Sequence, residues 1–165
     1  MYVSLCLPHL IKSAMPDIVV RRATLADLDT IVSFNAAMAR ETEDKPLDED
    51  TLRRGVHAAL HDEKKGRYWV AMRSNEVAGA LMCTTEWSDW RCGMFWWIQS
   101  VYVRPRHRRQ GVFTALYRNV YTTAKQDADV CGLRLYVEKE NTGAQQTYRH
   151  LGMDPTAYDM YEVEV

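Results

Sequence analysis

The chain has 165 residues, of which 47% are hydrophobic and 26% are charged, a composition typical of globular proteins. With about 150 residues per domain as a guide, this length predicts one domain whose core is large enough to need no cross-links. The 21 lysine and arginine residues nearly balance the 22 aspartate and glutamate residues. No overall charge therefore favours nucleic acid or a membrane as a partner.

The spacing of the cysteines indicates the compartment. Cys6, Cys83, Cys92 and Cys131 lie far apart, without the paired spacing of a metal site or the density of a secreted disulfide scaffold. They predict reduced thiols and a cytoplasmic protein.

Residues 1–16 have no basic residue ahead of their apolar run and precede the first periodic pattern. We expect a loosely ordered, flexible extension there rather than a signal peptide, with either Met1 or Met15 as the natural start. The domain itself is expected over residues 17–165. No later segment approaches the roughly 18 consecutive apolar residues of a membrane-spanning helix.

The first part of the domain predicts one strand and two helices. Residues 17–22 form a β-branched run typical of a strand. Thr24 and Asp27 have the spacing of a capping box, and an apolar helical face follows them. Asp48 is expected to cap a second helix, after an acidic loop.

Three strands are expected next. Residues 67–73 and 77–85 are strand-like and separated by a short polar segment, the pattern of a hairpin. Residues 95–103 predict a longer, buried strand.

The last part alternates helices and strands. Residues 112–125 and 141–150 predict helices, and residues 133–138 and 158–165 predict strands. This order is typical of an α/β or α+β sheet with a central βαβ crossover.

A basic stretch, RPRHRRQG at 104–111, joins the long strand to the next helix. Successive backbone N–H groups and a helix N-terminus favour anions, and Arg106, Arg108 and Arg109 would add donors for phosphate oxygens. Gly111 would let a phosphate approach the backbone closely. A pyrophosphate site is one interpretation; a solvated basic loop and a contact with a nucleic-acid backbone are the others.

Residues 108–113, RRQGVF, resemble the [QR]-x-x-G-x-[GA] loop of the GCN5-related N-acetyltransferases (GNAT). The likeness spans residues 18–165 and includes the strand ending IQSVYV, the helix TALYRNVYTTAK and the later segment LYVEKENTGAQQTYRHLGM. Phe113 departs from the pattern, since the family more often has glycine or alanine there. The resemblance implies a mixed, mostly antiparallel twisted sheet flanked by helices, with acetyl-CoA bound at the central crossover.

The resemblance also implies which residues bind acetyl-CoA. The pantetheine arm is expected beside the long strand, at Val101, Tyr102 and Val103. A strand splayed from its neighbour would leave amide and carbonyl groups free for such an arm. The pyrophosphate is expected on the loop and the helix start, at Arg108, Arg109, Gln110, Gly111, Val112, Phe113 and Thr114.

Tyr148 follows Asn141 by seven residues, so both project from one face of the predicted helix. The resemblance implies that Tyr148 binds the cofactor and is the general acid near the coenzyme sulfur, and that Asn141 contacts the pantetheine or caps the helix. A core tyrosine with a satisfied hydroxyl is the alternative for Tyr148.

The general base is less evident. The family often has a glutamate near the centre of the long strand, where this chain has Gln99 and Ser100, neither of which is a competent base. Glu86, at the end of the preceding strand, is the best carboxylate candidate, acting directly or through water, and a surface salt bridge is its alternative. The resemblance assigns the oxyanion to the backbone N–H of Val101 or Tyr102.

Six carboxylates lie between residues 41 and 50, on the segment that overhangs the acceptor site in related folds. Glu41 and Glu43 are the candidates for attracting a cationic amine, with a solvated loop as the alternative. Trp87 is expected either to form the floor of an acceptor pocket, where it would make a cation–π contact with the acceptor, or to pack in the core. Gln99 is a further substrate-binding candidate.

A metal site is not expected, because His57 and His61 have no visible third ligand. The chain is therefore predicted to be a cytoplasmic N-acetyltransferase that moves acetyl from acetyl-CoA to a primary amine of a small cationic molecule by direct attack. A protein or peptide N-acetyltransferase and a non-catalytic acyl-CoA sensor are the alternatives. Neither nucleic acid nor a membrane is an expected partner, and the aromatic-rich surface permits a homodimer.

Overall fold

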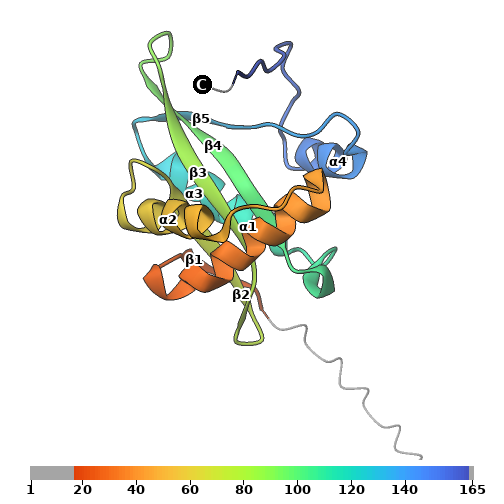
Figure 1. Cartoon of the computed structure of the whole chain (residues 1–165). Helices are drawn as coiled ribbons and strands as arrows, with labels where there is room; N and C mark the ends of the chain where they lie inside the picture. Colours follow the sequence, from red (N-terminus) through yellow and green to blue (C-terminus); the bar gives the residue numbers. More distant parts are fainter. Residues whose placement is uncertain (1–16, 164–165) are drawn as a thin grey trace, which may run out of the picture.

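The computed structural model describes residues 17–163, which form one sheet covered by helices (Figure 1). The helices that the sequence predicts are confirmed to within a few residues. The strands are β1 (Val19–Arg22), β2 (Arg67–Arg73), β3 (Glu76–Ser88), β4 (Gly93–Val103) and β5 (Val130–Leu135). The helices are α1 (Leu28–Glu43), α2 (Glu49–His61), α3 (Val112–Gln126) and α4 (Thr142–His150), with short 3-10 turns at Leu25–Asp27 and Pro105–His107.

Local hydrogen bonds start the first two helices where the sequence predicts. The backbone N–H of Thr24 donates to Asp27 Oδ2 at 2.8 Å, in a capping box on the turn before α1. Arg21 also donates to the buried Asp27 carboxylate and holds its pKa below the usual range. Asp48 caps α2 by accepting from the backbone N–H of Thr51 at 2.8 Å.

The strands lie in the order β1-β2-β3-β4-β5. Neighbouring strands are antiparallel except β4 and β5, which are parallel and connected through α3. This is the mostly antiparallel sheet with a βαβ crossover that the sequence predicts. The β2–β3 turn is tight, with Ser74 and Asn75 both at positive φ, as a two-residue hairpin turn of type I′ requires.

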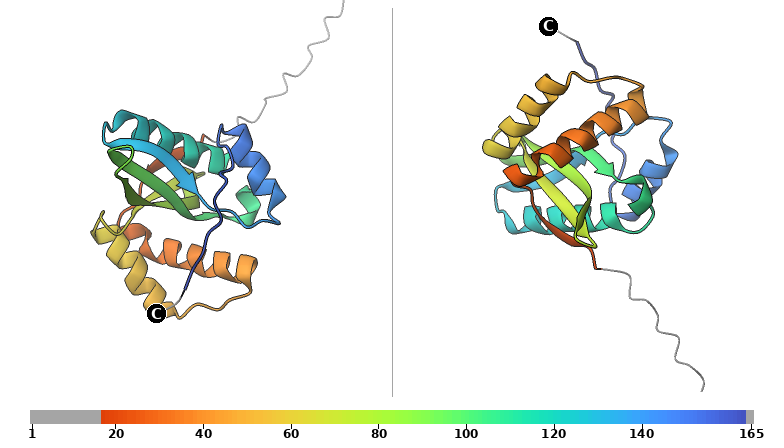
Figure 2. Two further views of the ribbon diagram at one scale, coloured as in Figure 1. Left: turned by 90° about the horizontal axis from the view of Figure 1, so that it is seen from above. Right: turned by 60° about the horizontal axis from the view of Figure 1, so that its bottom comes forward.

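Helices cover both faces of the sheet (Figure 2). α1 and α2 pack on one face, over a core that includes Ile31 and Val70. α3 packs on the other face, over a core that includes Trp69 and Leu116. Trp69 and Val70 are consecutive in β2, so strand alternation alone divides them between the two cores.

A bulge divides β4 into two parts. Its register with β3 shifts opposite residues 80–82, so that two residues of β4 face one of β3, and Ser100 at this point has φ 47°. The pairing with β5 ends where Ile98 faces Leu135. Residues 99–103 of β4 therefore have no strand partner on the β5 side.

The strand expected at 158–165 is wrong for its described part, because residues 158–163 pair with none of the strands found in residues 17–163. Alternating apolar and acidic residues favour an extended chain, but a strand also needs an open sheet edge beside it. After α4 the chain turns back above β5 without pairing with it (Figure 1). β5 begins and ends three residues earlier than the strand expected at 133–138. The N-terminal extension expected at 1–16 lies outside the described residues.

Candidate active site

A groove of about 630 Å³ lies beside the second part of β4. Its walls come from β4, the loop at 104–111, the start of α3, α4 and the C-terminal half of α1. The groove brings together most of the residues that the sequence singled out. These are Glu41, Val101, Tyr102, Val103, Arg108, Arg109, Gly111, Val112, Phe113, Thr114, Asn141 and Tyr148.

The walls also contain residues that the sequence analysis missed: Met38, Thr42, His107, Ala144 and Thr147. Helical spacing could have identified most of them. Met38 and Thr42 lie within one turn of Glu41 on α1, and Ala144 is one turn from Tyr148 on α4. Apart from its place in the basic stretch, nothing in the sequence marked His107 as a residue of the groove.

The start of α3 fits a phosphate group. Gly111 precedes the helix at φ 83° and no side chain caps the first turn, so its backbone N–H groups remain available. Arg109 also has positive φ, 59°. Turns of this kind aim successive N–H groups into one concavity that suits an anion. A Cβ on Gly111 would meet only Ile18 Cδ1, at 4.0 Å, so the space beside this backbone is open.

The free side of β4 fits an extended arm that carries amides. Residues 99–103 lack a partner on the β5 side, and Val101 and Val103 are only partly buried. An extended ligand lying there could pair with their backbone groups as a neighbouring strand would. These two backbone features lie where the sequence predicts the two ends of the acetyl-CoA site, and the assignment stays a prediction.

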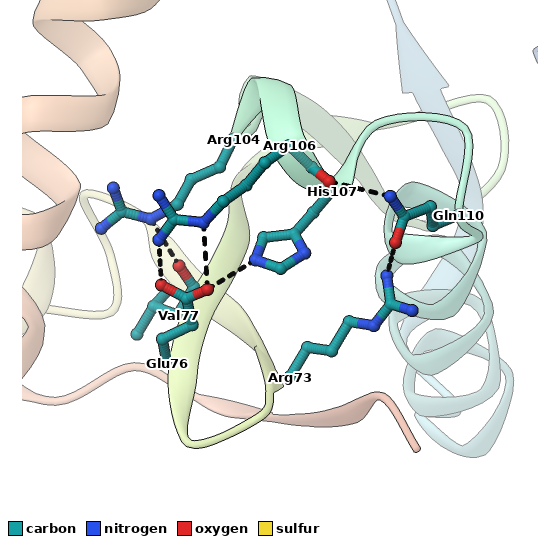
Figure 3. A network of polar contacts seen from close by, with 7 residues as sticks. All are labelled: Arg73, Glu76, Val77, Arg104, Arg106, His107 and Gln110. Carbon is teal, nitrogen blue, oxygen red and sulfur yellow. Dashed lines mark hydrogen bonds and ion pairs between the residues drawn. The ribbon is translucent and has the colours of Figure 1, made fainter. Parts of the chain in front are cut away.

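The hairpin between β2 and β3 holds much of the basic stretch (Figure 3). Arg106 and His107 both bind Glu76 at the start of β3, with His107 Nε2 at 2.7 Å from Glu76 Oε1. Arg106, which the sequence suggested as a phosphate donor, is therefore engaged outside the groove.

Two further contacts fasten the same loop (Figure 3). Arg104 Nε donates to the Val77 carbonyl at 2.8 Å. Gln110 accepts from Arg73 and donates to the Arg106 carbonyl at 2.8 Å. In the described part of the chain, the ion pairs of this loop include Arg106, His107 and Arg108 but not Arg109.

Glu41 connects α1 to the loop across the groove. Its Oε2 accepts from Arg108 Nη2 at 2.5 Å, and its Oε1 accepts from the Tyr102 hydroxyl at 3.0 Å. Arg108, and to a smaller extent Tyr102, lowers the pKa of Glu41. Burial, with Glu41 adding to it, raises the pKa of Tyr102. The groove thus holds a carboxylate and a neutral phenol side by side at neutral pH.

Tyr148 of α4 meets Phe113 of α3 edge-on, with ring centroids 5.6 Å apart. Burial raises the pKa of Tyr148, so its hydroxyl stays protonated near neutral pH. Phe113, the departure from the family motif, is therefore a packing partner of the candidate acid. Asn141 caps α4 by accepting from the backbone N–H of Ala144 at 3.0 Å.

Glu86 lies outside the walls of the groove. Its Oε1 accepts from Arg134 Nη1 at 2.7 Å and its Oε2 accepts from Trp97 Nε1 at 2.5 Å. Both carboxylate oxygens are therefore occupied, in the surface salt bridge that the sequence analysis kept as the alternative.

Four other candidates also lie outside the walls. Gln99 donates to Thr84 Oγ1 at 2.5 Å, Trp87 is 55% exposed, and Glu43 is exposed at the end of α1. Gln110 binds the hairpin instead.

Among residues 17–163, no three His, Cys, Asp or Glu side chains are grouped so that they could hold a metal ion. His57 and His61 stack on α2 with ring centroids 6.2 Å apart. None of the helices in this part of the chain has the length and apolarity needed to cross a membrane.

A mixed sheet whose β4 separates from β5 beside an uncapped helix start is the architecture of a coenzyme A-dependent acyltransferase. A sequence model of the acetyltransferase (GNAT) family matches residues 30–153. The chain therefore belongs to the GNAT acetyltransferase family. It is an acyltransferase, and acetyl-CoA is its co-substrate.

Solved structures share the fold. A possible acetyltransferase from Clostridium difficile 630 is 49% identical, with a TM-score of 0.83, 90% of this chain covered and 97% of that one. A predicted acetyltransferase with acetyl-CoA from Clostridium acetobutylicum is 18% identical, with a TM-score of 0.73, 90% of this chain covered and 96% of that one. The second likeness shows the fold alone. No curated protein matches the chain.

Removing the Glu76 carboxylate should weaken the hairpin contact in a pH-dependent way. Arg106 and then His107 lower the pKa of Glu76 from 4.5 to about 2. A lowered folded-state pKa stabilises the fold above about pH 4.5, and this stability is lost as the pH falls toward 2. The melting temperature of Glu76→Gln should therefore lie below that of the wild type at pH 7, and the difference should shrink by pH 3.

Thermal melts followed by circular dichroism measure this difference. Glu43→Gln, which replaces an exposed glutamate at the end of α1, is the control and should show no such trend. A Glu76→Gln difference of equal size at pH 7 and pH 3 would contradict the assignment.

Proposed function

We propose that this acetyltransferase moves the acetyl group to a primary amine of a small cationic molecule by direct attack. The observation that carries the proposal is the ionised Glu41 in the wall of the acetyl-CoA groove. A carboxylate in a concave site raises the local concentration of cations. The acidic residues that follow it, from Glu43 to Asp50, add to the same field.

Backbone groups carry most of the proposed binding of acetyl-CoA. The N–H groups from Arg109 to Thr114 take the pyrophosphate, and the backbone at 101–103 takes the pantetheine arm. The uncapped start of α3 and the missing strand partner of β4 support both assignments. Arg109 supplies a guanidinium, and Arg108 joins it when a phosphate competes with Glu41.

The proposed chemistry needs an uncharged amine, a proton for the leaving group and donors for the oxyanion. Acetyl-CoA supplies an acyl group activated as a thioester. The amine nitrogen forms a bond to the acyl carbon and the carbon–sulfur bond breaks. Tyr148 donates its proton to the departing sulfur, and the amine gives up a proton to a base. The N–H of Val101 or Tyr102 faces the developing oxyanion.

Tyr148→Phe should lower kcat by about 100-fold, the lower end of the usual range for general acid–base catalysis, while the Kd for acetyl-CoA changes little. The ring, and with it the packing on Phe113, is kept in this variant, so only the proton donor is lost. Steady-state rates and isothermal titration measure the two quantities. Tyr121→Phe on α3 is the control, because Tyr121 is half exposed and outside the groove. Unchanged kcat in Tyr148→Phe would remove the assigned role.

Glu86 stays the proposed base, acting through water, although Arg134 and Trp97 hold its carboxylate. Deprotonation by Glu86 requires one of these contacts to open when the acceptor binds. The pH–rate profile of Glu86→Gln should lose its acidic limb. A profile that matches the wild type would mean that solvent or another group, and not Glu86, takes the proton from the amine.

An amine panel tests the function itself. Release of CoA that depends on an added amine is expected, with diamines and other cationic amines used better than neutral ones. Glu41→Gln should raise KM for cationic acceptors about 10-fold and leave neutral acceptors unchanged, an effect equal to the loss of one favourable charge interaction of about 1.4 kcal/mol. Glu43→Gln is the matched control outside the groove and should have a smaller effect.

The panel also separates the alternatives. CoA release with peptides but not with small amines would favour a protein or peptide acceptor, and acetyl-CoA binding without any amine-dependent release would favour a sensor. Trp87 and Gln99 remain proposed contacts of the acceptor. We also propose that the protein is cytoplasmic and forms a homodimer.

A further inference from the structure

Arg73, the last residue of β2, is a buried cation, with only 6% of its surface exposed. Strand alternation directs its side chain to the same face of the sheet as Trp69 and Ala71, which pack in the core under α3. Arg73 is therefore the charged end of an otherwise apolar row. Its guanidinium points toward Gln110, just before the start of α3 (Figure 3).

This cation has no carboxylate partner. The ion pairs found among residues 17–163 do not include Arg73, and its side chain donates to the neutral amide of Gln110. Asp27, the other charged residue buried in this part of the chain, is paired with Arg21. Arginine is rarely buried without an opposite charge, because removing a charge from water costs free energy. Arg73 therefore lacks the opposite charge that burial normally requires.

The start of α3 adds to this excess of positive charge. The free N–H groups of a helix start carry a partial positive charge, which disfavours a nearby cation and favours an anion. The first turn of α3 contains no acidic residue, so the helix does not offset the charge itself. An anion held by the N–H groups that follow Gly111 would be attracted by both the helix start and the Arg73 guanidinium.

Arg73 is also connected to the turn that precedes α3. Gln110 lies between two residues with positive φ, Arg109 at 59° and Gly111 at 83°. Its side chain accepts from Arg73 and donates to the Arg106 carbonyl at 2.8 Å. Arg73 is not in the walls of the groove, so it acts on a ligand there through this turn and through its charge.

We propose that Arg73 is a positioning residue that makes the groove select acetyl donors with a diphosphate over pantetheine thioesters that lack one. It holds the turn through Gln110 and places a positive charge on the β2 side of the turn. Because water does not surround a buried charge, its attraction for a nearby anion is screened less than that of a surface arginine. The inference rests on the pyrophosphate site proposed above and adds a residue outside the groove to it.

The affinities for two acetyl donors test this role. Acetyl-CoA carries the diphosphate, whereas S-acetylpantetheine ends before it. Arg73→Gln should raise the Kd for acetyl-CoA about 10-fold, the size of one interaction with a charged group, and leave the Kd for S-acetylpantetheine unchanged. Isothermal titration measures the first Kd directly and the second by competition with acetyl-CoA.

Further variants separate the charge from the packing. Arg73→Lys keeps the charge and should restore most of the affinity for acetyl-CoA. Arg73→Met removes the charge but keeps a long apolar stem, and it should match Arg73→Gln. Arg118→Gln is the control, because Arg118 is exposed on α3 and outside the groove, and both Kd values should stay as in the wild type. Thermal melts of the ligand-free variants check that each is folded.

Three results would overturn the role of Arg73: an equal loss of affinity for both donors, no loss in Arg73→Gln, or an Arg73→Lys variant as weak as Arg73→Gln. The wild type keeps this inference apart from the proposed function. A wild type that binds both donors equally tightly would remove the pyrophosphate site and the inference with it. A wild type that prefers acetyl-CoA, with the same preference in Arg73→Gln, would remove the role of Arg73 alone.

Discussion

The separation of β4 from β5 is the constraint on which the site depends. Up to Ile98, β4 is an ordinary inner strand that pairs on both sides. The bulge at Ser100 then turns the strand, and its last residues keep only the β3 partner. Because α3 must start from this end of β4 to reach β5, the uncapped helix start lies next to the free backbone. One departure from regular pairing thus brings together both halves of the proposed acetyl-CoA site.

The position of the loop between β4 and α3 depends on side chains that are distant in the sequence. Glu76, in the hairpin, and Glu41, on α1, hold it from two directions. The loop therefore presents its backbone in a defined shape. Glu41 pairs with Arg108, and in the proposed function it also provides the negative charge that an acceptor would meet.

Features with local causes could be predicted from the sequence. The capping box at Thr24, the Asp48 cap, the amphipathic helices and the glycine at 111 each depend on residues a few positions apart. The partners of Glu41 and Glu76 could not, because they lie 67 and 30 residues away, and neither could the bulge, which no residue type in FWWIQSVYV marks. The strand expected at 158–165 is wrong in its described part for a different reason: residues 158–163 have the alternating pattern, but they do not pair with the open edge of β5.

The basic stretch at 104–111 carries much positive charge, but contacts within the chain leave only part of that charge free to bind an anion. Arg106 and Arg108 are each paired with a carboxylate of the same chain, and Arg104 donates to a backbone carbonyl, so less of the positive charge is unpaired than the sequence suggests. A long flexible polyanion, which binds mainly through many loose guanidinium contacts, would have to break these pairs one by one. A compact diphosphate needs only the fixed N–H groups of a short turn. The proposed pyrophosphate site would therefore recognise its anion mainly by the shape of the backbone, with charge as a secondary factor.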